Sequence, residues 1–134
     1  CENHGWLSSD AEKLMQAIED VNMANCGTLP DFGNWCTKRK DATAKWGECA
    51  EVYPDKYRGT KLMMAAAKAV SAKSYDFDEN GNETTIDYTK MLQIVKDASY
   101  TGFVGVEYEG SLLNETAGIK ATKNLLLTAA KQVK

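Results

Sequence analysis

Histidine is almost absent from this sequence: the 134 residues include one, His4. One histidine is too few for the common zinc clusters, and no two of the four cysteines have CxxC spacing. Basic runs interleaved with aromatic residues are also missing and the net charge is -3, so we expect no nucleic-acid partner. No apolar run approaches the roughly 18 residues of a membrane helix, so we expect no membrane partner either.

The cysteines leave the cellular compartment open. Cys26 lies in an apolar run, which is typical of a buried free thiol. Cys36 and Cys49 flank a polar loop and are either two free thiols or a disulfide. The disulfide would close a loop of about 14 residues, worth ~3 kcal/mol on the chain-entropy model, and would require an oxidising compartment. A cytoplasmic and an exported, periplasmic location are equally compatible with the sequence.

What the sequence does contain is a repeated order of strand, loop and helix. Residues 37–51 are polar and are predicted to be irregular or at most a short helix. Helices are predicted at 11–21, 54–68, 87–98 and 115–133, and strands at 1–5, 25–32, 69–75 and 103–108. Alternating strands and helices predict a parallel sheet, either an open doubly wound sheet or half of a barrel. A complete eight-stranded barrel needs about 250 residues, so the length favours a half-barrel fragment.

Polar residues cluster at the carboxyl ends of all four predicted strands, where barrel enzymes build their active sites. The clusters are Glu2–Gly5, Leu29–Asn34, Val70–Asp78 and Gly105–Gly110. Side chains two residues apart on a strand share a face. If Glu2 and Glu107 point into the barrel mouth, then His4, Lys73 and Glu109 do so as well.

The order and spacing of the four clusters resemble the last four strands of the sugar-phosphate isomerase/epimerase family. That family is similar in fold to xylose isomerase. The resemblance covers nearly the whole chain and implies one α/β domain over residues 1–134. The expected architecture is the C-terminal half of a (β/α)8 TIM barrel, with about four β/α units and parallel strands.

The resemblance also implies a divalent metal held by Glu2, Asp31 and Glu107. A further ligand in many relatives is a histidine, which would fall at Ser71, and serine is a poor metal ligand. An oxygen-rich site suits Mn²⁺ or Mg²⁺ better than Zn²⁺. Asp31 has an alternative role as a turn residue before Gly33.

The implied substrate is a small sugar. Glu2 and Glu107 are the expected catalytic residues, one removing the proton alpha to a carbonyl and the other returning it. His4, Lys73 and Asn34 are expected to bind the substrate, and Asn34 stands where related epimerases carry a histidine. Lys73 is alternatively a salt-bridge partner of the carboxylates.

Three functions remain open on the sequence. The first is a metal-dependent isomerase or epimerase of a sugar or keto-sugar. The second is a lyase or hydratase that acts on 3-keto-glycosides through the same alpha-proton step. The third is a degenerate barrel fragment that binds sugar without turnover. The single histidine argues against the endonuclease branch, whose three-metal site is rich in histidine.

A half-barrel would leave two sheet edges and an apolar inner face uncovered. The expected partner is therefore the missing N-terminal half-barrel or a second copy of the chain.

Overall fold

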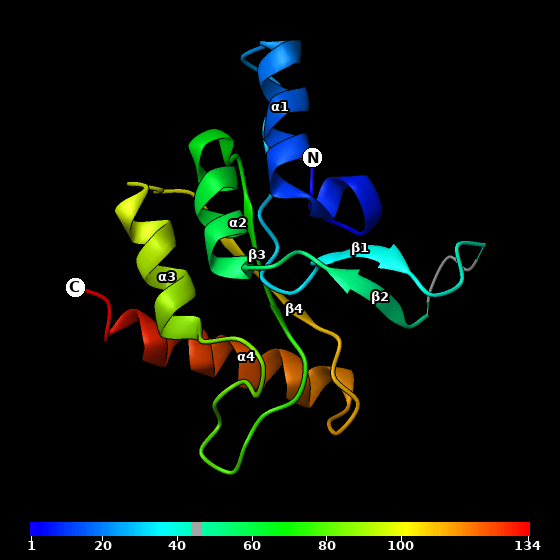
Figure 1. Cartoon of the computed structure of the whole chain (residues 1–134). Coiled ribbons are helices and arrows are strands. Elements are labelled where there is room, and N and C mark those ends of the chain that lie inside the picture. The colour runs from blue at the N-terminus through cyan, green and yellow to red at the C-terminus, as the bar shows by residue number, and fades with distance from the viewer. Residues whose placement is uncertain (44–46) are drawn as a thin grey trace.

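The computed structural model describes residues 1–43 and 47–134, so residues 44–46 of the segment predicted to be irregular lie outside the described part. The described residues form four α-helices, four strands and two 3-10 turns (Figure 1). In chain order they are η1 (Trp6–Ser9), α1 (Ala11–Val21), β1 (Cys36–Arg39), β2 (Cys49–Val52), α2 (Lys56–Met63), η2 (Met64–Ala66), β3 (Val70–Ser74), α3 (Tyr88–Asp97), β4 (Val104–Tyr108) and α4 (Glu115–Ala130).

The prediction of four parallel strands in half of a barrel is wrong. The strands form two separate two-stranded sheets, an antiparallel β1–β2 pair and a parallel β3–β4 pair. The segments predicted as the first two strands make only isolated parallel bridges, which join Glu2 to Leu29, Thr28 to Ala67 and Asp31 to Ser71.

The second predicted strand stays this short for a local reason. Pro30 has no N–H group to donate to a ladder. Directly after it, the Asp31 carboxylate accepts hydrogen bonds from the backbone N–H groups of Gly33 and Asn34, both at 2.8 Å. This Asp turn bends the chain out of the sheet direction. The result is a loop that carries polar side chains beside β3.

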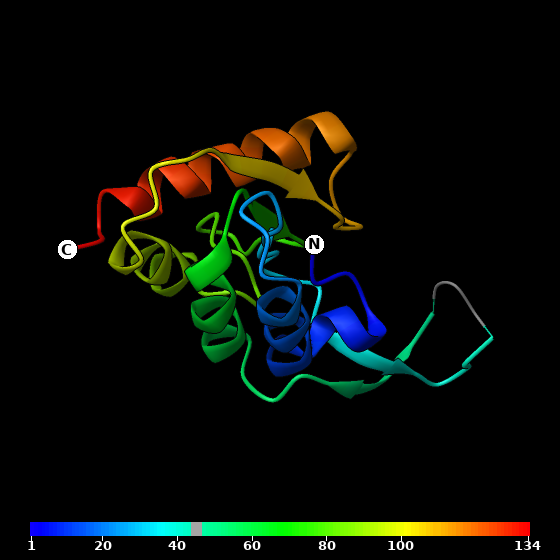
Figure 2. The ribbon, with the colours of Figure 1, turned by 90° about the horizontal axis from the view of Figure 1, so that it is seen from above.

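The β1–β2 hairpin occupies the segment predicted to be irregular or helical. Opposite charges face each other across it, with Lys38 Nζ 2.7 Å from Glu51 Oε1. Cys36 and Cys49 form a disulfide with a Cα–Cα distance of 5.8 Å, so the bonded alternative for this pair holds. Figures 1 and 2 show the hairpin extending from the body on the side away from the C-terminus.

The helices agree closely with the sequence pattern. Each begins after a side-chain cap, supplied by Asp10, Asp55, Asp87 and Asn114. The helix predicted to begin near Pro54 begins instead at Lys56, because Asp55 provides the cap. No described helix is both long and apolar enough to cross a bilayer.

The hydrophobic core consists of two separate clusters. One cluster surrounds β3 and α3 and includes Phe32, Ala72, Tyr88 and Met91. The other joins α1 to the base of the hairpin through Leu14, Trp35, Tyr53 and Met63. Figure 2 shows α4 lying along β4, with α1, α2 and α3 on the other side of β3. This packing buries β3 completely and leaves β4 near the surface.

Candidate active site

Strand β3 contributes buried polar side chains to the site. Every residue of Val70–Ser74 is buried, including Lys73, whose side chain has no exposed surface. The parallel register sets Lys73 directly opposite Glu107 on β4. A charged group in such a place is costly unless it is paired. The lysine is paired twice, with its Nζ 3.0 Å from Glu107 Oε1 and 2.9 Å from Glu109 Oε2.

The structure brings the three expected metal-binding carboxylates together. Glu2, Asp31 and Glu107 each offer an oxygen atom, and these atoms all lie within 4.8 Å of one another. Two oxygens on opposite sides of a Mg²⁺ ion lie roughly 4.2 Å apart, since each bond is about 2.1 Å. The three carboxylates are therefore close to the spacing that one shared cation requires.

Asn3 holds the segment of Glu2 against the Asp31 turn. Its amide Nδ2 donates to the backbone oxygens of Asp31 and Asn34, both at 3.0 Å, and its Oδ1 accepts from the Asp31 N–H at 2.7 Å. Asn3 is fully buried. Sequence interpretation assigned it no role, although it fixes two neighbouring carboxylates in place.

Asp31 is fully buried, and only one of its two carboxylate oxygens is occupied. Oδ1 accepts the two turn hydrogen bonds, whereas Oδ2 accepts none from any residue that the structure describes. Burial raises the pKa of Asp31 to about 6, and the nearby Ser71 hydroxyl and Lys73 ammonium offset part of that rise. A buried oxygen without a donor is costly, so this atom calls for a cation or a proton.

Glu107 is held as a charged carboxylate. Burial alone would raise its pKa, but the hydrogen bonds from Lys73 and Ser71 outweigh it and the pKa is lowered. The Ser71 hydroxyl donates to Glu107 Oε2 at 2.8 Å, which shows what serine does in place of the expected histidine ligand. For Lys73 burial lowers the pKa, but the charge of Asp31 and the bonds to Glu109 and Glu107 outweigh it, so the pKa is raised.

Asn34 connects the two halves of the cluster. Its Nδ2 donates to Glu2 Oε1 at 3.0 Å, and its Oδ1 accepts from Lys73 Nζ at 3.0 Å. His4 is exposed and lines the adjoining pocket.

The residues present fit a divalent cation. Glu2, Asp31, Glu107 and Glu109 bring four negative charges and Lys73 returns one positive charge, so the cluster keeps a formal charge of -3. All donor atoms are oxygens, which suits Mg²⁺ or Mn²⁺. The unpartnered Asp31 Oδ2 supports the same conclusion from an independent observation.

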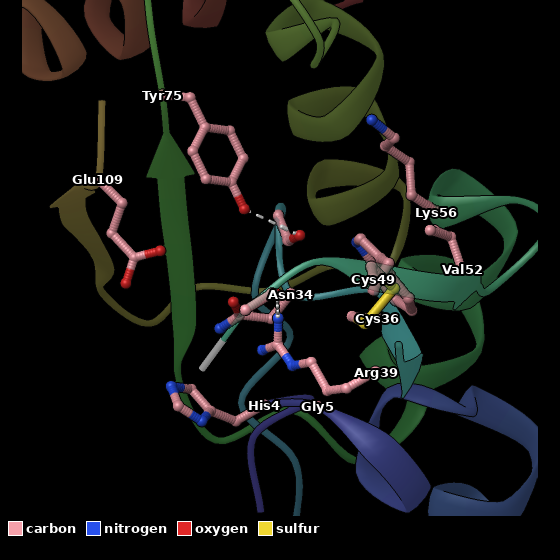
Figure 3. Close-up of a pocket in the computed structure, with 13 residues that line it drawn as sticks. His4, Gly5, Asn34, Cys36, Arg39, Cys49, Val52, Lys56, Tyr75 and Glu109 are labelled. Atoms are coloured by element: carbon pink, nitrogen blue, oxygen red, sulfur yellow. Dashed lines mark hydrogen bonds between the residues drawn. A yellow bond between two sulfur atoms is a disulfide. The ribbon is translucent and has the colours of Figure 1, made fainter. Parts of the chain in front are cut away.

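A pocket of about 420 Å³ adjoins the cluster. Asn34 and Glu109 lie on the shared border, and the opposite wall is the hairpin with its disulfide (Figure 3). The hairpin wall with Arg39 was not predicted from the sequence, and neither was a role for Tyr75, which follows β3 on the facing side. The paired cysteines and the opposite charges on either side of residues 40–48 were the available signal for a hairpin there.

Comparison with known proteins gives one partial match. A segment of 47 residues is 40% identical to the 3'-dehydrocarminate deglycosidase alpha subunit of a Microbacterium species. The match covers 35% of this chain and 14% of that protein, so the chain spans only a small part of the relative's length. No family model matches the chain. The name of that protein describes a glycoside-processing enzyme, and the xylose-isomerase-like assignment of this chain stays a prediction.

Proposed function

We propose that this chain carries the alpha-proton-transfer site of an enzyme that acts on a keto-sugar. The observation that supports this most directly is the convergence of Glu2, Asp31 and Glu107 within 4.8 Å, next to a buried lysine. Such a site could hold a cation. It also offers carboxylates as bases for the proton alpha to the substrate carbonyl.

The side chains divide into bases and positioning groups. Glu107 is ionised, with one oxygen bonded to Ser71 and the other to Lys73, so it is available as a proton acceptor of fixed orientation. Glu2 faces it across the cluster and is oriented by Asn34. One of these carboxylates removes the proton alpha to the carbonyl, and the other is placed to deliver a proton elsewhere on the substrate. Asn34, which lines the pocket, is placed to contact substrate oxygens, whereas the buried Lys73 orients Glu107 and Glu109.

Glu2, Asp31 and Glu107 are the residues that would hold Mn²⁺ or Mg²⁺. When bound, the cation would supply Lewis acidity toward the substrate carbonyl and its neighbouring hydroxyl. Without that assistance, a carboxylate whose pKa is lowered would be a weak base for a carbon acid.

The fate of the substrate after proton removal decides the reaction class. On a 3-keto-glycoside, loss of the proton from carbon 2 lets its electron pair form a double bond to carbon 1 while the bond from carbon 1 to the leaving group breaks. On a free keto-sugar, a proton is returned and the product is an isomer or epimer. The name of the partial relative favours the glycoside reaction, so we place it first and isomerisation second.

The test combines metal content with product analysis on the intact protein. We expect one equivalent of Mn²⁺ or Mg²⁺ per chain, and alpha-deuterium exchange of a phenyl 3-keto-glucoside in D₂O that a chelator stops and added Mn²⁺ restores. Released phenol identifies cleavage, whereas an altered sugar that keeps its phenyl group identifies epimerisation.

A sugar-binding protein without turnover is the competing function. It is favoured by the use of Ser71 and Lys73 to satisfy Glu107 internally. Absence of both stoichiometric metal and deuterium exchange, with sugar binding retained, would overturn the enzymatic proposal and support this one.

A further inference from the structure

Lys73 joins two carboxylates of the candidate site, and one of them has no task in the chemistry described so far. The lysine Nζ lies 3.0 Å from Glu107 Oε1 and 2.9 Å from Glu109 Oε2. It also donates to Asn34 Oδ1 at 3.0 Å, so the three donors of the ammonium group have three acceptors. Proton transfer between side chains requires contacts of about 2.6–3.2 Å, and both carboxylate contacts meet this requirement. The buried ammonium thus forms a continuous hydrogen-bonded path from Glu107 to Glu109.

Glu109 directly follows β4 and lies on the same side of the chain as Glu107. Its N–H donates to the Ser74 oxygen at 2.9 Å, so the parallel pairing with β3 continues one residue past the end of β4. Residues two apart on such an extended segment point to the same side. Figure 3 shows the Glu109 carboxylate turned toward β3. The Glu109 side chain is 48% exposed and lines the pocket, so a bound molecule can reach it, whereas Lys73 is completely buried.

The proposed glycoside reaction moves one proton from the sugar to the leaving group. In the first step Glu107 removes the proton from carbon 2, and the electron pair left behind is held by the carbonyl at carbon 3 as an enolate. In the second step this pair forms the double bond between carbons 1 and 2 while the bond from carbon 1 to the leaving oxygen breaks. That oxygen then needs a proton at the moment when Glu107 carries one.

From this arrangement we infer that Glu109 is the acid that protonates the leaving oxygen, and that Lys73 supplies Glu109 with the proton that Glu107 has taken. This inference rests on the proposed function. Lys73 gives one N–H proton to the Glu109 carboxylate and accepts the proton from Glu107, so it remains an ammonium ion. Glu109 then gives its proton to the leaving oxygen and becomes a carboxylate again. After one cycle all three side chains are back in their starting states, and the proton balance closes without a further donor.

The test compares two leaving groups of different basicity on the intact protein. The substrates are the 3-keto forms of phenyl β-glucoside and of 4-nitrophenyl β-glucoside. Phenolate is a strong base that needs a proton to leave, whereas the nitro group stabilises 4-nitrophenolate, which leaves without one. In Glu109→Gln we expect release of phenol to slow at least ~100-fold, since general-acid catalysis contributes that much, and release of 4-nitrophenol to stay near the wild-type rate. Deuterium exchange at carbon 2 should persist, because the Glu107 side chain is 39% exposed and can exchange its proton with water directly.

Glu51→Gln is the matched control, because Glu51 is also an exposed carboxylate paired with a lysine, 2.7 Å from Lys38 Nζ, but lies on the hairpin away from the cluster. It should release both phenols at the wild-type rates. Equal slowing of both compounds by Glu109→Gln, together with loss of exchange, would mean that Glu109 only holds Lys73 in place and would overturn the inference. Unchanged release of both would overturn it as well. His4 also lines the pocket, and a loss confined to the phenyl compound in His4→Gln but absent from Glu109→Gln would assign the acid to His4 instead.

The wild-type protein separates this inference from the proposed function. Exchange at carbon 2 with release of both phenols supports the proton-transfer site, and the variants then decide the role of Glu109. Exchange without release of either phenol keeps the proton-transfer site and overturns the role of Glu109 as an acid, because no group leaves. Absence of both exchange and release would overturn the proposed enzyme and the acid together.

Discussion

At the scale of single residues, Asp31 is a carboxyl group whose ionisation is made costly by burial. Its carboxylate is completely buried and its pKa rises from 3.8 to about 6. Between these two values the folded protein holds a proton that the unfolded chain has released. The contribution of this proton to stability is fully present below pH 3.8 and is lost as the pH rises through about 6.

Replacing Asp31 with asparagine should therefore stabilise the metal-free protein at neutral pH. In chelator, we expect the unfolding free energy of Asp31→Asn relative to wild type to increase by about 2 kcal/mol between pH 4 and pH 7. Urea denaturation across this range measures it. Asp20→Asn, at an exposed position on α1, is the control and should show no such increase. A flat difference for Asp31→Asn would contradict the raised pKa.

Replacing Glu107 with glutamine should abolish the proposed chemistry while keeping the shape of the side chain. We expect solvent-deuterium exchange alpha to the substrate carbonyl to fall at least ~100-fold, since general-base catalysis contributes that much. Glu109→Gln loses a bond to the same lysine but lies outside the trio of carboxylates, so its loss should be much smaller. Exchange by Glu107→Gln at the wild-type rate would remove Glu107 from the mechanism.

The residues of the carboxylate cluster could be named from the sequence because they stand at predicted strand ends, in the order that the resemblance to the isomerase/epimerase family implies. Glu2, Asp31 and Glu107 do converge. The supporting bonds could not be read in the same way. Asn3 donates to the backbone oxygen of Asp31, and the N–H of Asn34 donates to the Asp31 carboxylate. Both bonds depend on the geometry of the Asp31 turn. That information exists only once the chain is folded.

At the scale of elements, the β1–β2 hairpin depends on its disulfide. Its base is held by Trp35 and Tyr53, which are buried and have ring centroids 5.4 Å apart, with the Tyr53 N–H donating to the Trp35 oxygen at 2.8 Å. Above that base β2 is mostly exposed, and the two strands are joined by the Cys36–Cys49 bond and by the Lys38–Glu51 ion pair. A disulfide also favours the exported alternative, because such bonds persist in oxidising compartments.

Removing this bond with Cys36→Ser and Cys49→Ser together should lower the unfolding free energy by about 3 kcal/mol, the chain-entropy value for a loop of this length. Thermal unfolding of the wild type with and without reductant should show the same decrease. The double variant provides the control, since reductant should no longer change its melting temperature. A wild type that is unaffected by reductant would mean that the hairpin is held by its charges and its base alone.

The helices were predictable from the sequence because their signals are local. A cap such as Asp87 and an apolar stripe such as that of Met91, Leu92 and Val95 both lie within a dozen residues. The strands β3 and β4 were predicted as well, but the division into two separate sheets was not, because strand pairing depends on partners elsewhere in the chain. Apolar content alone predicted a strand around Pro30, and the hydrogen bonds of the Asp31 turn prevailed over it.

At the scale of the whole molecule, β4 and the segments beside it are incompletely covered. Within the described residues, β4 pairs with β3 alone. Phe103 is 93% exposed and Leu112 is 75% exposed, and both flank this strand. An open strand edge next to exposed apolar side chains is a surface that invites a further chain.

We therefore expect the 134-residue chain by itself to self-associate. Sedimentation in dilute solution should show species larger than 14.7 kDa, and Phe103→Lys should shift them toward the monomer. Val21→Lys, at an exposed apolar position on α1, is the control and should leave the size distribution unchanged. A stable monomer that unfolds cooperatively would show that the edge needs no cover.

The spread of the carboxylates along the chain has a consequence for the order of folding. The disulfide joins residues only 13 apart, whereas Glu2 and Glu107 come from distant parts of the sequence. Contacts between near residues form early and contacts between distant ones late, because long loops cost more entropy to close. The hairpin can thus form and oxidise before β4 docks beside β3. A partly folded chain offers a cation only scattered carboxylates, so binding of the proposed metal would mark a chain whose folding is complete.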